Sequence, residues 1–453
     1  MKNILVAILC CCFVSCSASE AEIVDSERIE KEDEIEVQET IIPEGDVSDI
    51  SLYPAQPYFQ EGAGYNGTEL ENLSPEKIKT FVKNNLISDT ENLQSLIDGL
   101  SEIGGGKVFI PAGNYKIKNV LLKSNIHITF DEGVVIHMDT NRPGKGFLFN
   151  LGVDRFDTTI ENVQLKGLGN PSERPKLYLE RNNANGFRRA IAMGNIKNVL
   201  IENFSIYDEY TKGTAIAMNP VQIDETSAYI PENVTIANVS MTGASIGYGL
   251  AQTNTGRNIL LKNLVCEGGM TCRIEAHTGR HLDIGVYNII IKNVVSRNGK
   301  AAVLLQPHSV VNGRVMVDVA MAEGSTWTLF LKEGFVASDS KRREKGSFDA
   351  SSTFKNISLF SKDDTASMSF KNFKYVPEKL QYLYYPPNFV RNELDVNHAL
   401  GSNGEFSNES PITGPSVAVI FKDTSYPLNI PKTSEIVLKG VVVDRLKLLE
   451  PNK

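Results

Sequence analysis

The sequence predicts an all-β protein whose main part is a parallel β-helix. A short pattern of Asn, a β-branched apolar residue, any residue and a second apolar residue recurs along the chain. The segments between the copies are long and irregular and lack the tight turns of β-hairpins. A β-sandwich built of similar strands is the alternative, and these irregular gaps argue against it.

Each copy of the repeat predicts one short strand with one face turned inward, because polar and apolar residues alternate in it. The Asn suits a left-handed bend between strands, where its side chain can bond the adjacent turn. Successive copies are 37, 36, 35, 25, 30 and 68 residues apart. We expect the longer gaps to hold loops or an unmarked turn. The copies begin at Asn125, Asn162, Asn198, Asn233, Asn258, Asn288 and Asn356.

A helix is expected at the N-terminal end of the β-helix. Asp89-Thr90-Glu91 opens a stretch with apolar residues at helical spacing, and this stretch ends at the glycines 104–106. A strand is predicted over 108–115. An open end of a solenoid would expose its apolar core, so we expect this helix to cover it.

The remaining boundaries follow from composition. Residues 51–336 form the predicted β-helix. The repeat breaks over 337–400, where Lys341-Arg342-Arg343 and a run rich in Tyr predict an irregular excursion or small subdomain. Residues 401–453 return to β-strands. Cys266 and Cys272 could close a small disulfide in an oxidising compartment, but two buried free thiols are predicted.

The first sixteen residues read as a bacterial lipoprotein signal peptide. Lys2 precedes a short apolar run that ends at Cys16, which would become the acylated first residue. An ordinary secretory signal cut nearby is the alternative. Both predict export, to the outer membrane or cell surface or into the medium. Membrane contact is expected only through the lipid on Cys16.

An acidic tether is predicted over residues 17–50. This stretch holds 13 acidic and two basic residues and no aromatic residue, so it cannot bury a core. The formal net charge of −9 therefore comes from this stretch, and the rest of the chain is nearly neutral. Such a body does not repel a polyanion as the overall charge suggests. No basic nucleic-acid patch is present.

The densest polar stretch of the sequence, 247–308, is the candidate site. If Arg273, Glu275 and His277 share one strand, they project to the same face. Residues two apart on a strand are separated by ~6.6 Å, and an inverting glycosidase separates its acid and base by about 6.5–9.5 Å. Arg273 would lower the pKa of Glu275 or bind an anionic substrate group. A surface ladder of solvated side chains is the alternative.

This stretch resembles the iota-carrageenases, glycoside hydrolase family 82, and weaker similarity extends over most of 85–450. The resemblance implies a right-handed parallel β-helix that hydrolyses β-1,4 bonds of a sulfated galactan with inversion. The N-terminal helix and strand likewise resemble the cap of pectin-lyase-like β-helices. The matching residues include Tyr248-Gly249-Leu250, Gln252-Thr253, Asn258-Ile259-Leu260, Glu267-Gly268-Gly269, Arg273, Glu275, Ala301-Ala302-Val303 and Pro307-His308.

The resemblance also implies catalytic roles. Glu275 matches the proton donor, Gln252 matches a glutamine that holds the nucleophilic water and a halide, and His308 matches a histidine of the catalytic subsite. Residue 277 matches the catalytic base, usually an Asp, but is His277 here. A neutral His accepts a proton at pH 7, yet it gives a cationic transition state less electrostatic help. Asp283 or His281 holding the water is the alternative.

The expected function is endo-hydrolysis of iota-carrageenan by a monomer. Arg273 and Arg280 are the expected ligands of sulfate, and Tyr248 offers an aromatic face to a sugar ring. We expect no required cofactor; a halide or a calcium ion is the bound ion to look for. A β-helix polysaccharide lyase and a non-catalytic surface glycan-binding protein are the alternatives. No acid cluster near 273–308 supports the lyase, whereas His277 keeps the binding protein open.

Overall fold

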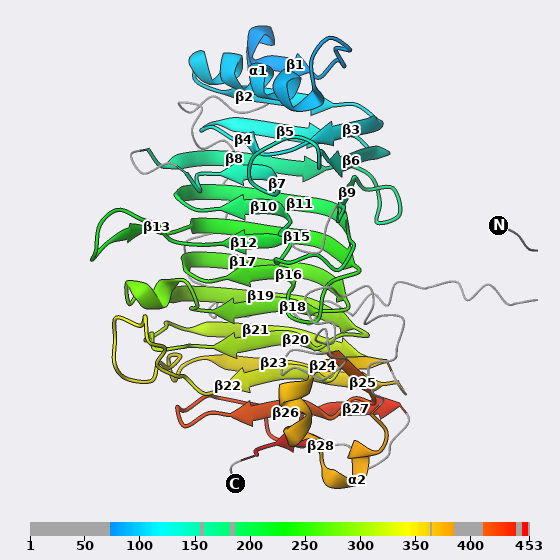
Figure 1. Ribbon diagram of the computed structural model, residues 1–453, viewed down its shortest axis with the longest axis vertical. Coiled ribbons are helices and arrows are strands. Elements are labelled where there is room, and N and C mark those ends of the chain that lie inside the picture. The colour runs from blue at the N-terminus through cyan, green and yellow to red at the C-terminus, as the bar shows by residue number, and fades with distance from the viewer. Residues whose placement is uncertain are drawn as a thin grey trace, which may run out of the picture. The chain divides into compact units, whose positions relative to one another are not determined.

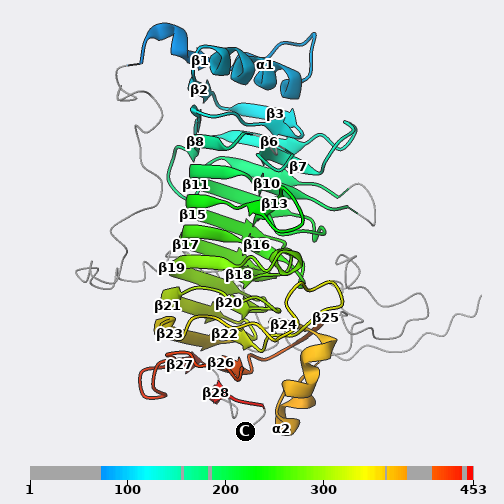
Figure 2. The same ribbon diagram turned by 90° about the vertical axis from the view of Figure 1, so that its left-hand side faces the viewer.

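The computed structural model describes residues 73–154, 158–181, 186–362, 365–384, 411–440 and 446–451. These residues form a parallel β-helix in which two sheets run side by side along the solenoid (Figures 1 and 2). The predicted fold class is therefore confirmed. The predicted signal peptide, the tether over 17–50 and Cys16 lie outside the described residues.

The first sheet is parallel throughout its main path, β1-β2-β5-β8-β11-β15-β17-β19-β21-β23-β27. Strands β3, β6 and β9 join it at one side through β11. The bounds are β1 (Ile78–Thr80), β2 (Gly106–Ile110), β3 (Gly113–Ile117), β5 (Ile126–Phe130), β6 (Val134–Met138), β8 (Ile160–Gly167), β9 (Lys176–Leu179), β11 (Ile196–Asp208), β15 (Glu232–Thr242), β17 (Gly256–Glu267), β19 (Val286–Arg297), β21 (Val315–Glu323), β23 (Thr353–Ser361) and β27 (Val437–Gly440).

The second sheet carries the candidate site and follows the order β28-β26-β22-β20-β18-β16-β12-β10-β7-β4. Its bounds are β4 (Val120–Leu121), β7 (Phe147–Leu151), β10 (Arg189–Met193), β12 (Ile216–Met218), β16 (Gly249–Thr253), β18 (Met270–Glu275), β20 (Ala301–Gln306), β22 (Trp327–Lys332), β26 (Ala418–Asp423) and β28 (Leu446–Leu449). Two short antiparallel pairs lie outside these sheets: β13 (Val221–Gln222) with β14 (Ala228–Tyr229), and β24 (Ala366–Ser369) with β25 (Pro411–Gly414).

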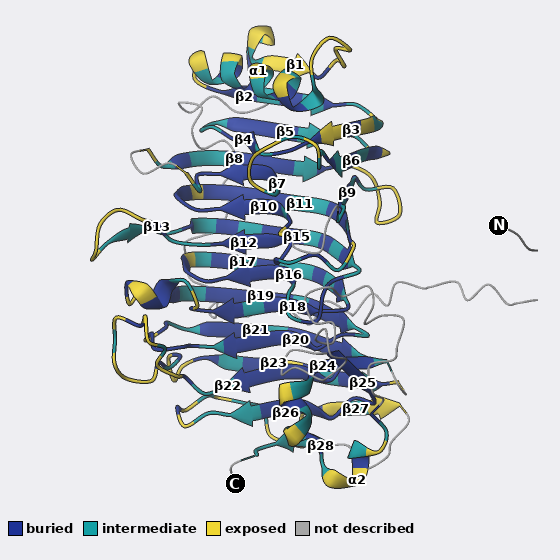
Figure 3. Ribbon diagram, viewed as in Figure 1, coloured by how far each residue is buried: buried dark blue, intermediate teal, exposed yellow. Residues whose placement is uncertain are grey.

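The core lies between the sheets, where inward side chains stack from turn to turn and the strands are mostly buried (Figure 3). Cys266 and Cys272 are part of this core as free thiols, as predicted. Burial raises the pKa of the Cys266 thiol to about 12, so this thiol stays protonated at neutral pH.

The predicted capping helix is α1 (Asp89–Glu102), which lies across the N-terminal end of the β-helix (Figures 1 and 2). Ser88 and Glu91 form a capping box that bonds the free N–H groups of the first turn. The helix buries Leu93, Ile97 and Leu100 against the first strands. Gly104 and Gly105 then take positive φ angles of 88° and 110°, which end the helix without the steric cost of a Cβ.

Asn side chains form two ladders along the first sheet, and each ladder marks a bend that recurs at the same position in successive turns. All seven Asn residues of the repeat have positive φ, as the sequence predicts. Within the ladders, the amide Nδ2 of one Asn commonly donates to the Oδ1 of the Asn one turn away, for example Asn258 to Asn233 at 2.9 Å and Asn288 to Asn258 at 2.8 Å. The side chain thus stabilises a strained bend and bonds the turns together.

The seventh copy of the repeat belongs to a different ladder from the other six. The register of β21 with β23 aligns Asn356 with Val319, and the register of β19 with β21 aligns Val319 with Asn293. Asn356 therefore continues the second ladder, in which Asn263 bonds Asn238 at 2.8 Å. The 68-residue gap contains the unmarked turn β21, where Arg314 stands in the first ladder instead of Asn and Val319 takes a φ of 57°.

The region predicted as an excursion contains a regular strand. β23 lies within 337–400 and extends the first sheet, because the inward Phe354, Ile357 and Leu359 match the core of β21. The following segment, with the 3₁₀-helix η5 (Phe370–Tyr375) and α2 (Glu378–Gln381), packs its Leu380 and Tyr384 in one apolar cluster with Trp327 of the second sheet. Two further 3₁₀-helices among the described residues are η3 (Pro75–Lys77) and η4 (Gly279–His281).

The ladder predicts a separable effect of two substitutions at Asn263. Its Nδ2 donates to Asn238 and its Oδ1 accepts from Asn293 at 2.9 Å, and its φ is 53°. Asn263→Gly should lower the free energy of unfolding by about 1–3 kcal/mol through the two lost hydrogen bonds. Asn263→Ala should cost roughly 1 kcal/mol more, because Ala opposes the left-handed bend. Chemical denaturation checks both, and equal losses would refute the role of the bend.

Candidate functional site

Three polar side chains converge on the outer face of the second sheet. Arg273 and Glu275 both project outward from β18, two residues apart, and the register places Gln252 of β16 beside Arg273. Glu275 is the last residue of its strand and is only 8% exposed. The parallel register therefore brings Gln252 close to Glu275, which lies 23 positions later in the sequence.

Donors surround the carboxylate of Glu275. Arg273 Nη2 donates to Oε2 at 2.6 Å, and Gln252 Nε2 lies 3.5 Å from the same oxygen. His308 Nε2 lies 3.2 Å from Oε1. Burial acts to raise the pKa of Glu275, but the charge of Arg273 and the hydrogen bond of His308 outweigh it and hold this pKa well below its ordinary value. Glu275 is therefore a carboxylate in the free protein.

His277 does not continue the strand, contrary to the expectation from its spacing. The chain turns at Ala276, so that the N–H of His277 donates to the carbonyl of Glu275 at 2.7 Å. The strand spacing of ~6.6 Å therefore does not apply to Glu275 and residue 277. The turn nevertheless keeps the imidazole at the site, edge to face with His308 at a centroid distance of 5.3 Å.

His277 is suited to accept a proton. Burial lowers its pKa from the ordinary value of 6.5, and the nearby charge of Arg280 acts in the same direction. The imidazole is thus neutral at pH 7. Asp283 and His281, the alternative groups for holding the water, are exposed, as His277 is, and His281 pairs with Asp339.

His308 is held in place by an unusual backbone and a loop. It follows β20, is 2% exposed and has a φ of 54°, a region in which a non-Gly residue is strained. Its carbonyl accepts from the N–H groups of Phe335 at 2.9 Å and Gly346 at 2.8 Å. The ring of Phe335 lies 4.6 Å from the imidazole. These contacts direct His308 towards Glu275.

The three side chains expected to bind substrate differ in what they contact. Arg273 also donates to the carbonyl of Gly247 at 2.6 Å and lies 5.8 Å from the ring of Tyr248. Arg280 is instead engaged by Asp339, through two hydrogen bonds of 2.8 and 2.7 Å, and by the carbonyl of His277. Arg280 thus joins the backbone of His277 to Asp339.

Several residues of the site were not predicted from the sequence. Asn254 accepts from Gln252 at 3.3 Å and donates to Asn219 at 2.9 Å, so an amide ladder borders Glu275. Asp339 comes from a loop 59 residues after its partner Arg280. Burial lowers the pKa of Arg189 to about 10, and the charge of Arg273 acts in the same direction. No local motif marks these residues, because only contacts between segments distant in the sequence bring them to the site.

Lysines extend the positive charge to the other side of Glu275. Lys332 of β22 follows Gln306 in the outward row that contains Glu275, and its charge acts on that carboxylate. Burial lowers the pKa of Lys332, Asp423 opposes this, and the charges of Lys371 and Lys374 add to it. The outer face of the second sheet therefore presents cations on both sides of Glu275.

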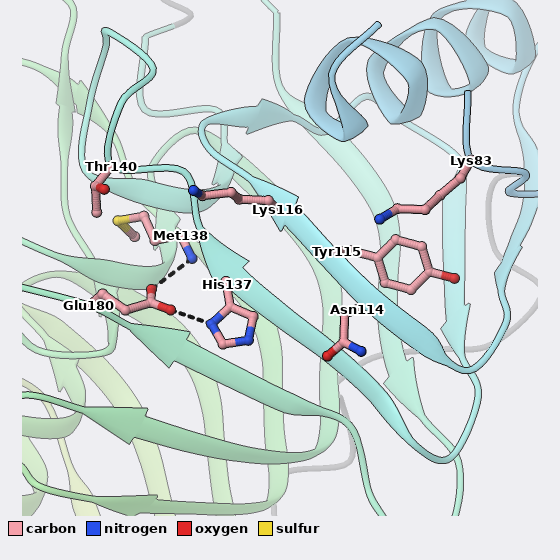
Figure 4. Close-up of a pocket in the computed structure, with 8 residues that line it drawn as sticks. All are labelled: Lys83, Asn114, Tyr115, Lys116, His137, Met138, Thr140 and Glu180. Atoms are coloured by element: carbon pink, nitrogen blue, oxygen red, sulfur yellow. Dashed lines mark hydrogen bonds and ion pairs between the residues drawn. The ribbon is translucent and has the colours of Figure 1, made fainter. Parts of the chain in front are cut away.

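A separate hollow of about 380 Å³ lies on the outer side of β3 and β6 (Figure 4). It is lined by Lys83, Tyr115, Lys116 and His137, and its single carboxylate, Glu180, bonds His137. The ring of His137 is stacked on Tyr178. This hollow belongs to the first sheet and holds none of the residues around Glu275, so we place the candidate active site on the second sheet.

Neither a metal cluster nor a spanning helix occurs in the part of the chain that the structure describes. No group of three or more His, Cys, Asp or Glu side chains there could hold a metal ion. No helix within the same residues is long and apolar enough to cross a membrane.

Comparison with known proteins confirms the relationship predicted from the sequence. No protein-family profile matches the chain. An iota-carrageenase of Zobellia galactanivorans is 28% identical over 326 residues, which are 70% of this chain and 64% of that protein. An iota-carrageenase of Alteromonas macleodii is 32% identical over 241 residues, which are 52% of this chain and 47% of that protein. The chain thus matches less than two thirds of the length of these curated relatives.

Solved structures show the same fold over a larger part of the chain. An iota-carrageenase complexed with iota-carrageenan fragments superposes with a TM-score of 0.66 at 21% identity. The match covers 83% of this chain and 91% of that structure. It confirms the parallel β-helix with most of its turns.

The ion pair at Glu275 predicts a pH-dependent contribution to stability. Its pKa is lowered in the folded state, so the stabilisation is full above the unfolded value of about 4.3 and is lost as pH falls below it. The difference in Tm between wild type and Glu275→Gln should be constant from pH 8 to 6 and shrink below about pH 4.3. Glu232→Gln, at a more exposed pair with Arg257, should show little change. A Tm difference independent of pH would contradict the ion pair.

Proposed function

Because this chain is related in sequence to the iota-carrageenases, we propose that the protein is an endo-acting glycoside hydrolase. The proposed substrate is iota-carrageenan, cleaved at β-1,4 linkages with inversion of configuration. The observation that carries this proposal is the buried carboxyl of Glu275 in contact with Arg273 and His308, with the neutral His277 beside it. This supplies one group to donate a proton and another to accept one.

The charges of the site suit a sulfated polymer. Sulfate esters stay ionised at all ordinary pH values, and guanidinium groups bind such oxyanions well. Arg273 shares β18 with Glu275, Arg189 lies on β10 to one side of that strand, and Lys332 lies on β22 to the other. An extended polyanion lying across the outer face of the second sheet would therefore meet cations on both sides of the cleavage point.

In the proposed reaction, Glu275 gives its proton to the glycosidic oxygen as the bond to the anomeric carbon breaks. A water molecule attacks that carbon from the opposite face, and His277 takes its proton. Gln252 bonds Glu275 and Asn254 and would orient the water. The reaction converts a neutral carboxyl and a neutral imidazole into a carboxylate and an imidazolium. Because His277 begins uncharged, it offers an oxocarbenium-like transition state less stabilisation than an Asp would.

Bound ions and location are also proposals. A halide beside Gln252 is supported by the long donor distances of its Nε2, 3.3 and 3.5 Å, which leave room for a further acceptor. No step of the reaction depends on that halide or on calcium. The sequence around Cys16 supports export as a lipoprotein, anchored by the lipid and otherwise free of the membrane, and we propose a monomer.

The proposed hydrolase predicts a specific loss of activity in Glu275→Gln. The purified protein should release reducing ends from iota-carrageenan, and the variant should be slower by about 10²–10⁴-fold, as expected for a lost general acid. Kappa-carrageenan, lambda-carrageenan and pectate are the comparison substrates. An unsaturated product from pectate would support a lyase. Binding of iota-carrageenan by folded protein without any cleavage would support a glycan-binding protein.

The His at position 277 predicts a gain of activity. His277→Asp should increase kcat on iota-carrageenan, because a carboxylate stabilises the developing positive charge as well as accepting the proton. His277→Ala should reduce kcat. The initial rates of both variants and the wild type provide the measurement. If His277→Ala kept full activity, another group would have to be the base.

A further inference from the structure

In the free protein Glu275 is ionised, whereas the proposed reaction needs it protonated. Every contact that the structure gives to the Glu275 carboxyl oxygens comes from a group able to donate: Arg273, Gln252 and His308. A carboxyl group surrounded by donors is ionised. The side chain of Glu275 is also buried, so solvent does little to weaken these interactions. An acid catalyst must carry a proton when the substrate is bound, so binding itself has to change these surroundings.

Arg273 is the contact that a substrate can alter. Its Nη2 bonds Glu275 and its Nη1 bonds the carbonyl of Gly247, but its Nε is buried without a hydrogen-bond partner among the described residues. The Nε of Arg189, whose pKa the charge of Arg273 lowers, is likewise buried without a hydrogen-bond partner among the described residues. Two guanidinium groups whose charges interact, each with an unused donor, suit the binding of an oxyanion.

We infer that a sulfate group of the bound polysaccharide takes Arg273 away from Glu275 and thereby makes Glu275 take up a proton from solvent. This inference rests on the proposed function. Its chemical basis is that a sulfate ester is a much weaker base than a carboxylate. When both anions compete for one guanidinium, only the carboxylate can relieve the repulsion by protonation.

The other charged groups that face Glu275 do not remove this effect. His308 stays in contact with Oε1 and can bond either form of the carboxyl. His277 is neutral at pH 7, as shown above. Lys332 acts on Glu275 from β22, but it pairs in register with Asp423 and forms no direct contact with the carboxylate among the described residues. Arg273 therefore has the dominant control over the proton on Glu275.

The inference gives the sulfate a second role besides recognition. A sugar chain without sulfate at this position would leave Arg273 on Glu275, so the acid would stay ionised even when the chain is bound. Discrimination against such a chain would then appear in kcat as well as in KM. Selectivity for sulfated polymers would follow from the protonation of the catalyst.

Calorimetric titration in two buffers with different heats of ionisation measures the predicted proton uptake. The ligand is an iota-carrageenan tetrasaccharide, with its desulfated form as the comparison. At pH 6.5 the wild type should take up close to one proton per sulfated tetrasaccharide bound and none with the desulfated one. Glu275→Gln should bind the sulfated ligand without proton uptake. Arg257→Gln, which removes a guanidinium remote from the site on β17, should behave as the wild type does.

Each outcome separates the inference from the proposed function. No binding of the sulfated tetrasaccharide would overturn both. Binding by the wild type without proton uptake would overturn the inference and leave the hydrolase standing. Uptake that persists in Glu275→Gln would assign the proton to another group and also overturn it. If circular dichroism shows that Glu275→Gln folds poorly, Arg273→Gln provides the test instead. In that variant Glu275 lacks its guanidinium partner before binding, so proton uptake should fall well below that of the wild type.

Discussion

The turn-to-turn bonding of Asn side chains is the interaction on which the rest of this protein depends. A parallel β-helix must bend its chain at the same place in every turn, and a left-handed bend is unfavourable for residues other than Gly. Asn relieves the backbone locally and also bonds the amide of the adjacent turn, as Asn258 does with Asn233. The bends therefore stay aligned, and the strands between them keep a fixed register.

The active-site candidates are arranged by that register and by irregular segments at its edge. Gln252 and Arg273 are neighbours because the parallel register of β16 and β18 pairs these two residues directly. Glu275 ends its strand, and beyond it the pattern stops: the chain turns at Ala276, and His308 adopts a strained conformation. A rigid sheet thus presents the acid, whereas loops bring His277 and His308 to it. This division is common in enzymes built on regular scaffolds.

Charge distinguishes this site from an ordinary polar patch. Glu275 interacts with Arg273 and Lys332 with little solvent to weaken these interactions, and Arg273 in turn interacts with Arg189. The state of its proton therefore depends on which anions are present nearby. The replacement of the expected Asp by His277 removes a second negative charge from the same place. Both features make the protonation of the site responsive to a charged ligand.

The sequence by itself determined the periodic features. The repeated Asn, the alternation of apolar residues and the amphipathic stretch before the glycines predict the β-helix, its bends and its cap, because these depend on contacts within one turn or between equivalent positions. It also indicated Arg273 and Glu275, which occupy regular positions on a strand. Only the tertiary structure decided the turn that takes His277 off the strand, the pairing of Arg280 with Asp339 and the place of Arg189 and Asn254. These contacts join distant segments through irregular backbone, for which sequence spacing gives no geometry.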